Sequence, residues 1–261
     1  NDAAVAVAEL VGGSEPVFVE QMNARAAELG LQNTSFRNAC GLDAEGHLST
    51  ARDVAALSCY ILNTCPEVLH YTGIWTDTLR GGATQLVNTN KLVRFYEGCT
   101  GLKTGFTAEA MYCISATAER GGMELIAAVM HAQSAQSRNE DAKALLNYGF
   151  SAYKLSRIQP EEPLAPLPVS GGTAREVALC LAEEDAWVLL EKSAAGELRQ
   201  SVSLPEGAAA PIEPGQPLGE LTVSGPGGTL KVIPIRAAQA VEKLTWAGAL
   251  RQVLEAALFH P

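Results

Sequence analysis

The chain has 261 residues, of which 47% are hydrophobic and 18% are charged, and its formal net charge is −10. This composition is typical of a globular protein with one large or two medium domains, and it excludes a largely disordered chain. The acidic balance argues against binding to a phosphate backbone, so we expect no nucleic-acid partner.

The six cysteines and four histidines are spread along the chain. No two cysteines form a Cys-x-x-Cys pair and the histidines stand far apart, so we expect neither a metal site nor a cofactor. An even number of cysteines permits disulfides, but a chain of this length does not need them to fold. We therefore expect mostly free thiols, which suits a reducing or anaerobic setting.

Three helices are predicted in the first part of the chain. Residues 2–10 are rich in Ala and Val and precede Gly12-Gly13, which suits a glycine-terminated helix. A second helix begins after Ser14, with apolar residues one turn apart, and ends at Gly30. The stretch NTSFRNACGLDAEGHLST (33–50) predicts a loop, after which Thr50 and Asp53 resemble a capping box that opens a third helix.

Extended segments follow in the middle of the chain. Residues 76–98 predict a hairpin region, in which Asn88 and Asn90 are interpreted as turn residues, with a place on a cleft wall as the alternative. Residues 112–118 alternate in polarity, Gly121-Gly122 suits a turn and residues 125–130 are an apolar run, which together predict a hairpin. Residues 140–150 then show the apolar spacing of a helix.

Lys103-Thr104-Gly105 stands just before the second hairpin, where a strand would carry it to the edge of a cleft. Glycine lacks a Cβ, so the backbone of a ligand could lie against the strand at this point. The threonine hydroxyl and the compact charge of the lysine suit an anionic group such as a carboxylate. Taken alone, the three residues are also compatible with an ordinary strand that carries a surface lysine.

Composition changes at about residue 157, where RIQPEEPLAPLPVSGG (157–172) has the proline content of a domain linker. Short alternating runs separated by Pro and Gly clusters continue to residue 238 and predict a small β-sandwich or barrel. The last segment, 239–261, has the period of an amphipathic helix. It either docks on its own protein or lies on a membrane surface, because it is too short and too charged to span a bilayer.

Three stretches, in order, resemble the low-molecular-mass penicillin-binding proteins that act as D-alanyl-D-alanine carboxypeptidases. They are NDAAVAVAELVGGSEPVFVEQMNARAAELGLQNTSFRNACGLDAEGHLSTARDVA (1–55), GLKTGFT (101–107) and SRNEDAKALLNYGF (137–150). The resemblance continues through the β-rich segment and the terminal helix. It implies an α+β fold with part of a penicillin-binding or β-lactamase-like antiparallel sheet and its helices in 1–156, a small all-β domain in 157–238 and an amphipathic helix in 239–261.

Enzymes of this family carry three motifs: Ser-x-x-Lys with the nucleophile, Ser-x-Asn, and Lys-Thr-Gly. Lys-Thr-Gly is complete at 103–105, and of the second motif only Asn1 is present. The first motif is expected upstream of residue 1. One Ser-x-x-Lys match does occur at 151–154, but it follows Lys-Thr-Gly and is interpreted as coincidence.

The resemblance implies a serine-type carboxypeptidase that removes the terminal D-alanine of peptidoglycan pentapeptides through an acyl-enzyme and also binds penicillin. Asn1 and Lys103 would have catalytic roles. Asn1 would orient the substrate amides, and the charge of Lys103 would discourage protonation of the lysine in the missing motif.

The same resemblance assigns residues that bind the substrate: Lys103, Thr104, Gly105, Thr107 and Arg138. Thr104 and Arg138 would contact the terminal carboxylate, and the backbone near Thr107 would contribute to the oxyanion hole. The alternative for Arg138 is an ordinary residue at a helix N-terminus. Phe106 stands where some relatives carry His, which leaves a polar role there unsupported.

Partners and location follow from the resemblance as well. Peptidoglycan peptide stems and β-lactams would be the ligands, and the protein would act outside the cytoplasm, either secreted or anchored to the outer face of the cytoplasmic membrane. Since the sheet of this fold includes N-terminal strands and a serine-bearing helix, we also expect a missing N-terminal segment to cover open sheet edge and core.

Two other hypotheses remain. A catalytically inactive, wall-associated scaffold or binding module is the main alternative. A class A β-lactamase fits less well, because it lacks the long β-rich segment.

Overall fold

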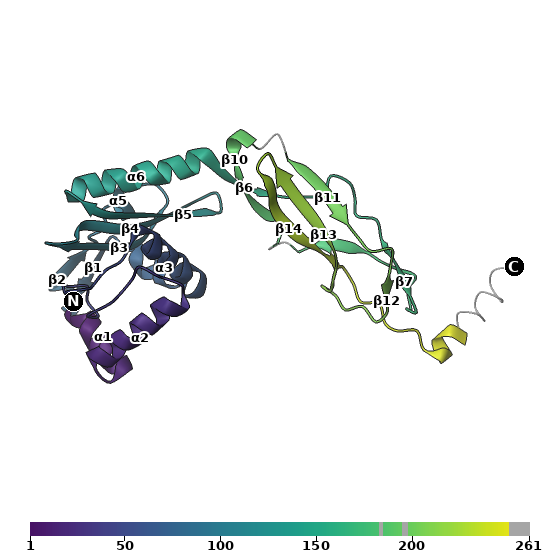
Figure 1. Cartoon of the computed structure of the whole chain (residues 1–261), viewed down its shortest axis with the longest axis horizontal. Helices are drawn as coiled ribbons and strands as arrows, with labels where there is room; N and C mark the ends of the chain where they lie inside the picture. Colours follow the sequence, from purple (N-terminus) through teal and green to yellow (C-terminus); the bar gives the residue numbers. More distant parts are fainter. Residues whose placement is uncertain (183–184, 195–197, 251–261) are drawn as a thin grey trace. The chain divides into compact units, whose positions relative to one another are not determined.

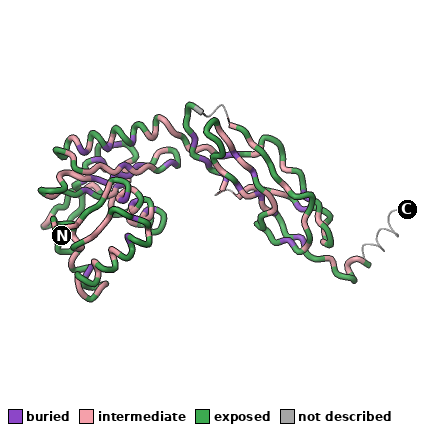
Figure 2. The backbone as a smooth tube through the Cα atoms, in the orientation of Figure 1, coloured by how far each residue is buried: buried purple, intermediate pink, exposed green. Residues whose placement is uncertain are grey.

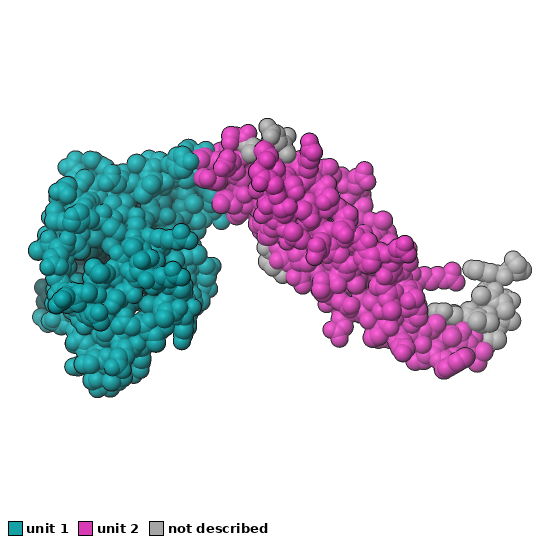
Figure 3. All heavy atoms as spheres, viewed as in Figure 1, with its two compact units in different colours: residues 1–151 teal, residues 152–261 magenta. Residues whose placement is uncertain are grey.

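The computed structural model describes residues 1–182, 185–194 and 198–250. The chain divides into two compact units, Asn1–Ser151 (unit 1) and Ala152–Pro261 (unit 2), which are coloured separately in Figure 3. Each unit has its own hydrophobic core and is described by itself.

The elements of unit 1 are labelled in Figure 1. They follow one another as α1 (Asp2–Gly12), α2 (Glu15–Glu28), α3 (Ala51–Thr64), α4 (Val68–Thr72), β1 (Thr76–Leu79), β2 (Thr84–Val87), α5 (Leu92–Phe95), β3 (Cys99–Thr107), β4 (Met111–Arg120), β5 (Met123–Ala132) and α6 (Ala135–Ala152). A short 3-10 turn, Arg80–Gly82, joins β1 to β2.

An antiparallel sheet with the strand order β3-β4-β5 forms the centre of unit 1. Helix α6 lies along one face of this sheet and α3 against the other, as Figure 1 shows. Side chains alternate along β4, so that Ile114 enters a buried cluster with Leu92 and Leu146, whereas Ser115 bonds to α3. Figure 2 shows the buried positions gathered along the strands and the facing helices.

The predicted starts and stops of the first helices are confirmed. Gly13 ends α1 with a φ of 77°, a left-handed conformation that favours glycine. The Thr50 side chain caps α3 by accepting a hydrogen bond from the backbone N–H of Asp53 at 3.1 Å. The buried Asp53 carboxylate in turn accepts hydrogen bonds from Asn33 N at 2.9 Å and Thr34 Oγ1 at 2.8 Å, so it ties the preceding loop to the helix.

Two local predictions needed correction. The hairpin predicted for 76–98 ends at Val87, because Asn90 Oδ1 accepts a hydrogen bond from Leu92 N and starts the short helix α5. The helix predicted for 140–150 begins at Ala135 instead. Ser134 and Ser137 exchange side chain-to-backbone hydrogen bonds of 3.0 and 3.1 Å, which form a capping box with serine in the place of the usual glutamate.

Unit 2 is built almost wholly of strands. They are β6 (Tyr153–Arg157), β7 (Leu167–Ser170), β8 (Glu176–Val177), β9 (Leu179–Leu181), β10 (Trp187–Glu191), β11 (Arg199–Ser203), β12 (Ala208–Ala209), β13 (Pro217–Gly225) and β14 (Gly228–Ala237), with a 3-10 turn at Lys192–Ala194. They form the sheets β11-β13-β14-β9, β12-β7-β8 and β10-β6 around two buried aliphatic clusters. The predicted α+β class with a small all-β part is confirmed.

The start of unit 2 and the start of its terminal helix lie at other residues than predicted. Strand β6 pairs with β10, so the compact units divide after Ser151, and the division predicted at 156/157 stays a prediction. The tail predicted as helix from 239 is helical only from 246 in the described part, because Val241 is buried in the core of unit 2. Residues 251–261 of that tail lie outside the described residues. Within the described part of the chain, no helix is long and apolar enough to cross a membrane.

Candidate active site

Lys103, Thr104, Gly105 and Thr107 all lie on β3, which is an edge strand of the central sheet. The Lys103 side chain is exposed, and its ammonium group contacts the carbonyl oxygen of Thr104. A Cβ built on Gly105 would meet no atom within 4 Å, so the strand is open to a ligand at this point. The predicted strand at this motif is confirmed, and it lies at an edge of the sheet, whereas the predicted cleft beside it stays a prediction.

Thr104 faces the other side of the strand and is only 7% exposed. Its hydroxyl oxygen lies 2.7 Å from that of Thr89, in the segment between β2 and α5. This contact was not predicted, because the two residues are 15 positions apart and only the folded chain brings them together.

A second hydroxyl pair lies behind Lys103. Ser115 stands directly opposite Lys103 on β4, and its Oγ lies 2.7 Å from Oγ of Ser58 on α3. Ser58 also donates to the carbonyl oxygen of Val54 at 2.7 Å, so the one hydrogen of the Ser58–Ser115 contact comes from Ser115. The pair fastens α3 to the strand that supports Lys103. No local pattern marked either serine.

Arg138 is a buried, positively charged residue of the candidate site. Its side chain is only 5% exposed, and both Nε and Nη2 donate to the side-chain oxygen of Asn139, at 3.1 and 3.0 Å. Burial lowers the pKa of the guanidinium, and the nearby Cys113 and Tyr112 act in the opposite direction. Arginine nevertheless remains charged at neutral pH. Among the described residues, no carboxylate forms an ion pair with it.

The position of Arg138 relative to Lys-Thr-Gly follows from the strand register. Cys113 and Tyr112, the residues that influence its pKa, stand opposite Gly105 and Phe106 on β3. The guanidinium of Arg138, which has no acid partner among the described residues, thus lies near Tyr112 and Cys113 of β4, the strand that pairs with the motif strand.

The end of β3 beyond Gly105 is shaped by an aromatic pair and a turn. The exposed Phe106 packs on Tyr112 with ring centroids 4.4 Å apart, so an apolar contact occupies this position. The Thr107 hydroxyl accepts a hydrogen bond from Ala110 N at 2.9 Å and stabilises the turn into β4.

Asn1 shares no hydrogen bond with this group in the described part of the chain. It is exposed at the start of α1, where its backbone oxygen accepts hydrogen bonds from Ala4 and Val5. Its side chain does not cap the helix, and no hydrogen bond connects it to β3 within the described part of the chain. The remaining predicted site residues are brought together around β3 and β4, whereas Asn1 is not joined to them by a direct contact.

The Ser-x-x-Lys match at 151–154 lies away from β3, on α6 and β6. Ser151, at the end of α6, donates to the carbonyl oxygen of Tyr148 at 2.9 Å, and Lys154 lies on β6. All six cysteines are free thiols in this structure. The described residues contain no group of three or more His, Cys, Asp or Glu side chains that could hold a metal ion.

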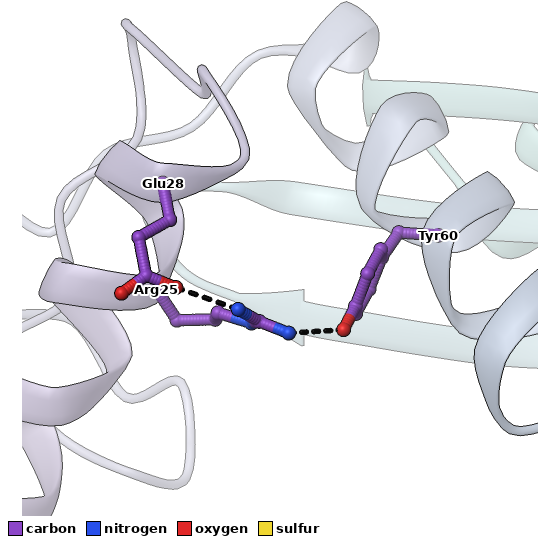
Figure 4. A network of polar contacts seen from close by, with 3 residues as sticks. All are labelled: Arg25, Glu28 and Tyr60. Carbon is purple, nitrogen blue, oxygen red and sulfur yellow. Dashed lines mark hydrogen bonds and ion pairs between the residues drawn. The ribbon is translucent and has the colours of Figure 1, made fainter.

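An apolar groove lies between α2 and α3 in unit 1. It encloses about 340 Å³ and is lined by Phe18, Gln21, Met22, Arg25, Ala26, Leu29, Leu31, Phe36 and Leu57. Figure 4 shows a polar network at this groove, in which Arg25 of α2 donates to Glu28 at 2.6 Å and also to the hydroxyl of Tyr60 on α3. These contacts raise the pKa of Arg25, with the bond to Glu28 as the largest cause.

The sequence was compared with those of known protein families. The profile described as D-alanyl-D-alanine carboxypeptidase matches residues 1–134, slightly more than half of the chain. The chain belongs to this family. A second profile, described as the C-terminal domain of penicillin-binding protein 5, matches residues 157–243 in unit 2 of this carboxypeptidase-family chain.

Curated relatives of this carboxypeptidase-family chain match it over most of its length. It is 36% identical to the D-alanyl-D-alanine carboxypeptidase DacF of Bacillus subtilis over 247 residues, which are 93% of the chain and 63% of DacF. It is 32% identical to DacC of Escherichia coli over 248 residues, 93% of the chain and 61% of DacC. The chain thus spans less than two thirds of these relatives.

Solved structures give the same assignment. Penicillin-binding protein 5 from Haemophilus influenzae superposes with a TM-score of 0.73 at 28% identity, over 93% of this chain and 71% of that protein. Penicillin-binding protein D2 from Listeria monocytogenes, solved in its cefotaxime-bound form, superposes with a TM-score of 0.54 at 41% identity, over 57% of this chain and 61% of that protein.

Proposed function

We propose that this chain is the C-terminal portion of a serine-type D-Ala-D-Ala carboxypeptidase. The enzyme would remove the terminal D-alanine of peptidoglycan pentapeptides through an acyl-enzyme and would also bind penicillin. The observation that carries the proposal is the buried guanidinium of Arg138, which has no acid partner among the described residues and lies near β4, the neighbour of the strand with Lys103-Thr104-Gly105, in a chain of the D-alanyl-D-alanine carboxypeptidase family.

The substrate's terminal carboxylate is the anion that fits these groups. A charge-assisted hydrogen bond from a buried guanidinium is stronger than one between neutral groups, and Thr104 would add a hydroxyl donor. Gly105 leaves room for the peptide backbone along β3. The positive charge of Lys103 would favour the neutral, basic form of the lysine in the Ser-x-x-Lys motif.

The roles proposed for Asn1 and for the backbone near Thr107 do not rest on a contact with Lys103, Thr104 or Arg138. Asn1 would orient the substrate amides once the preceding part of its motif is in place. The backbone near Thr107 would supply one donor of the oxyanion hole, where an N–H group stabilises the charge that develops on the attacked carbonyl.

We infer that an N-terminal segment of the gene product supplies the nucleophile and packs on unit 1. The apolar groove between α2 and α3, the outer edge of β5 and the exposed Leu10 and Val11 of α1 are surfaces that such a segment would cover. The greater length of the curated relatives supports this inference. A longer gene product should therefore bind less of an apolar dye such as ANS than residues 1–261 alone; equal dye binding would contradict it.

The location proposed is outside the cytoplasm, secreted or held at the outer face of the cytoplasmic membrane. Trp246 is 94% exposed and Leu250, one helical turn later, is 62% exposed, which favours a membrane surface over docking on the protein's own core. In a liposome flotation assay, Trp246→Ala should reduce the bound fraction, and unchanged flotation would contradict a membrane role for this tail.

The activity is tested on the gene product that contains this chain. A fluorescent penicillin should label it covalently, and chromatography should detect D-alanine released from a pentapeptide ending in D-Ala-D-Ala. A folded product that neither takes the label nor releases D-alanine would favour the inactive scaffold instead. Binding of cefotaxime by the Listeria protein supports the choice of a β-lactam as the probe.

A further inference from the structure

Thr89 is placed to control the hydroxyl group of the motif threonine. Its Oγ1 lies 2.7 Å from Oγ1 of Thr104, and either atom of the pair could be the donor. Thr104 is 7% exposed, whereas Thr89 is exposed. None of the three family motifs includes Thr89, so it is a residue outside them that bonds directly to a proposed binding residue.

The backbone around Thr89 is fixed by the two asparagines that flank it. Asn88 donates from its side chain to the carbonyl oxygens of Thr72 and Ile74, at 3.0 and 2.8 Å. Asn90 is 1% exposed and donates to the carbonyl oxygen of Gly101 on β3 at 2.7 Å. The Asn90 bond holds the segment against the strand that carries Thr104, and the Asn88 bonds fix it to the end of α4, so its position is set without a ligand.

The direction of the hydroxyl–hydroxyl bond decides what Thr104 offers a ligand. If Thr104 donates to Thr89, its only hydrogen is used and it cannot donate to a carboxylate. If Thr89 donates, Thr104 accepts through a lone pair and its own hydrogen is free. An ionised carboxylate only accepts, so it selects the second arrangement, and the donated bond also polarises the Thr104 hydroxyl.

We propose that Thr89 is a positioning residue, which donates to Thr104 Oγ1 and thereby aims the Thr104 hydrogen at the terminal carboxylate of the ligand. The identity of this ligand as a D-alanine-terminated peptide rests on the proposed function. The bond to Thr104 itself does not.

The experiment compares Thr89→Val, Thr89→Ser, Thr104→Val and the double variant Thr89→Val/Thr104→Val in the gene product that contains this chain. The probes are a peptide ending in D-Ala-D-Ala and the same peptide with its terminal carboxylate amidated. Where the wild type hydrolyses the free acid, KM and kcat are measured; where it does not, the dissociation constants of both peptides are measured by calorimetry. If the wild type does not hydrolyse the peptide, the proposed function is refuted. The dissociation constants of the variants then still decide the role of Thr89.

Loss of one hydrogen bond should weaken recognition of the free acid about fivefold in Thr89→Val, through KM or Kd rather than kcat. Thr89→Ser keeps the hydroxyl and should restore the wild-type value. The amide should be unaffected, and Thr89→Val should have no further effect in the Thr104→Val background. The exposed Thr78 on β1 provides a matched control, and Thr78→Val should behave as the wild type.

Four outcomes would overturn the proposal. In the first, Thr89→Val has the wild-type KM or Kd for the free acid, and in the second it weakens binding of the amide as much as that of the free acid. In the third, its effect adds to that of Thr104→Val in the double variant, and in the fourth Thr89→Ser does not restore the wild-type value. Additivity would mean that Thr89 contacts the ligand by itself. Because Thr89 is exposed, its variants should keep the wild-type Tm, and a lowered Tm with uniform loss on both peptides would likewise show a structural role.

Discussion

At the level of single residues, the burial of Arg138 is unfavourable in free energy, unlike that of an uncharged helix residue. Its guanidinium is buried without a carboxylate among the described residues, and burial of a charge is unfavourable unless other groups compensate it. The oxygen of Asn139 supplies two hydrogen bonds but no negative charge. This arrangement favours the functional interpretation of Arg138 over a purely structural one, because an anionic ligand would complete it.

Replacing Arg138 by glutamine should keep a polar side chain but remove its charge. A hydrogen bond to a charged group contributes about 1.5–3 kcal/mol, so kcat/KM for a free-acid peptide should fall roughly 10- to 100-fold, mainly through KM. Activity on the amidated peptide should change little. The exposed Arg94 offers the control Arg94→Gln, and an equal loss in both variants would contradict a specific role for Arg138.

At the level of elements, the start of α3 determines how the loop 33–50 is held. The Thr50 side chain caps the helix, and Asp53 one turn later accepts two hydrogen bonds from the opposite end of the loop. α3 is also the helix that bonds to β4 through Ser58. Weakening its first turn therefore affects both the loop and the support of the site.

Thr50→Ala should destabilise unit 1 by about 1 kcal/mol, because the variant leaves the N–H of Asp53 without its capping acceptor. The free energy of unfolding in urea measures this loss. Thr50→Ser keeps the acceptor and should retain most of the stability. If both variants unfold at the wild-type midpoint, the cap contributes nothing.

Asp53 should make the stability of unit 1 sensitive to acid. Its hydrogen bond from Thr34, with those from Asn33 and Thr50, lowers the pKa of the carboxyl, and burial opposes this shift. Because the folded-state pKa is below the unfolded value of about 3.9, the stabilisation is fully present above pH 4 and is lost as the pH falls through the folded-state pKa.

The comparison of Asp53→Asn with the wild type isolates this effect. The difference in Tm between them should be largest near neutral pH and should shrink below pH 4. Asp43→Asn, at an exposed position of the same loop, should show no such trend. A difference that is independent of pH would exclude ionisation of Asp53 as its cause.

At the level of the whole molecule, each unit buries its own core. The core of unit 2 comprises two aliphatic clusters contributed by its own strands and by residues outside them, namely Ile158, Ile212 and Val241. The core of unit 1 lies between α6 and the central sheet. The contacts that stabilise unit 2 are therefore independent of those that form the site.

Residues 152–261 should consequently fold alone. Expressed by themselves, they should give a cooperative thermal transition and dispersed amide NMR signals. In the whole chain, Arg138→Gln should not change the thermal transition of unit 2. Unfolded spectra of the isolated segment would show that unit 2 depends on unit 1.

Local signals and the family resemblance anticipated much of this arrangement. Gly12-Gly13 and Thr50 with Asp53 marked helix ends, and Gly121-Gly122 marked the hairpin next to the motif strand. These predictions succeed because glycine conformation and helix capping depend on neighbouring residues alone. The start of α6 was missed because serine takes the place of glutamate in its capping box.

The contacts behind the motif could not be predicted in this way. Thr89 meets Thr104, and Ser58 meets Ser115, only because separate elements pack on the same sheet. In the sequence, nothing distinguishes these threonines and serines from other hydroxyl residues, because their partners come from distant segments. For the same reason the sequence alone permits both interpretations of Arg138, since the lack of an acid partner among the described residues is a property of the packed structure.

The guanidinium of Arg138, which forms no ion pair with any described carboxylate, also bears on the choice of solution for laboratory work. If Arg138 binds the substrate carboxylate as proposed, it should also donate hydrogen bonds to sulfate, citrate or acetate when these are abundant. Such buffers would compete with the substrate and stabilise the folded protein by mass action. Chloride-based, weakly coordinating media at low ionic strength are the conditions under which its affinity for peptides can be compared between variants.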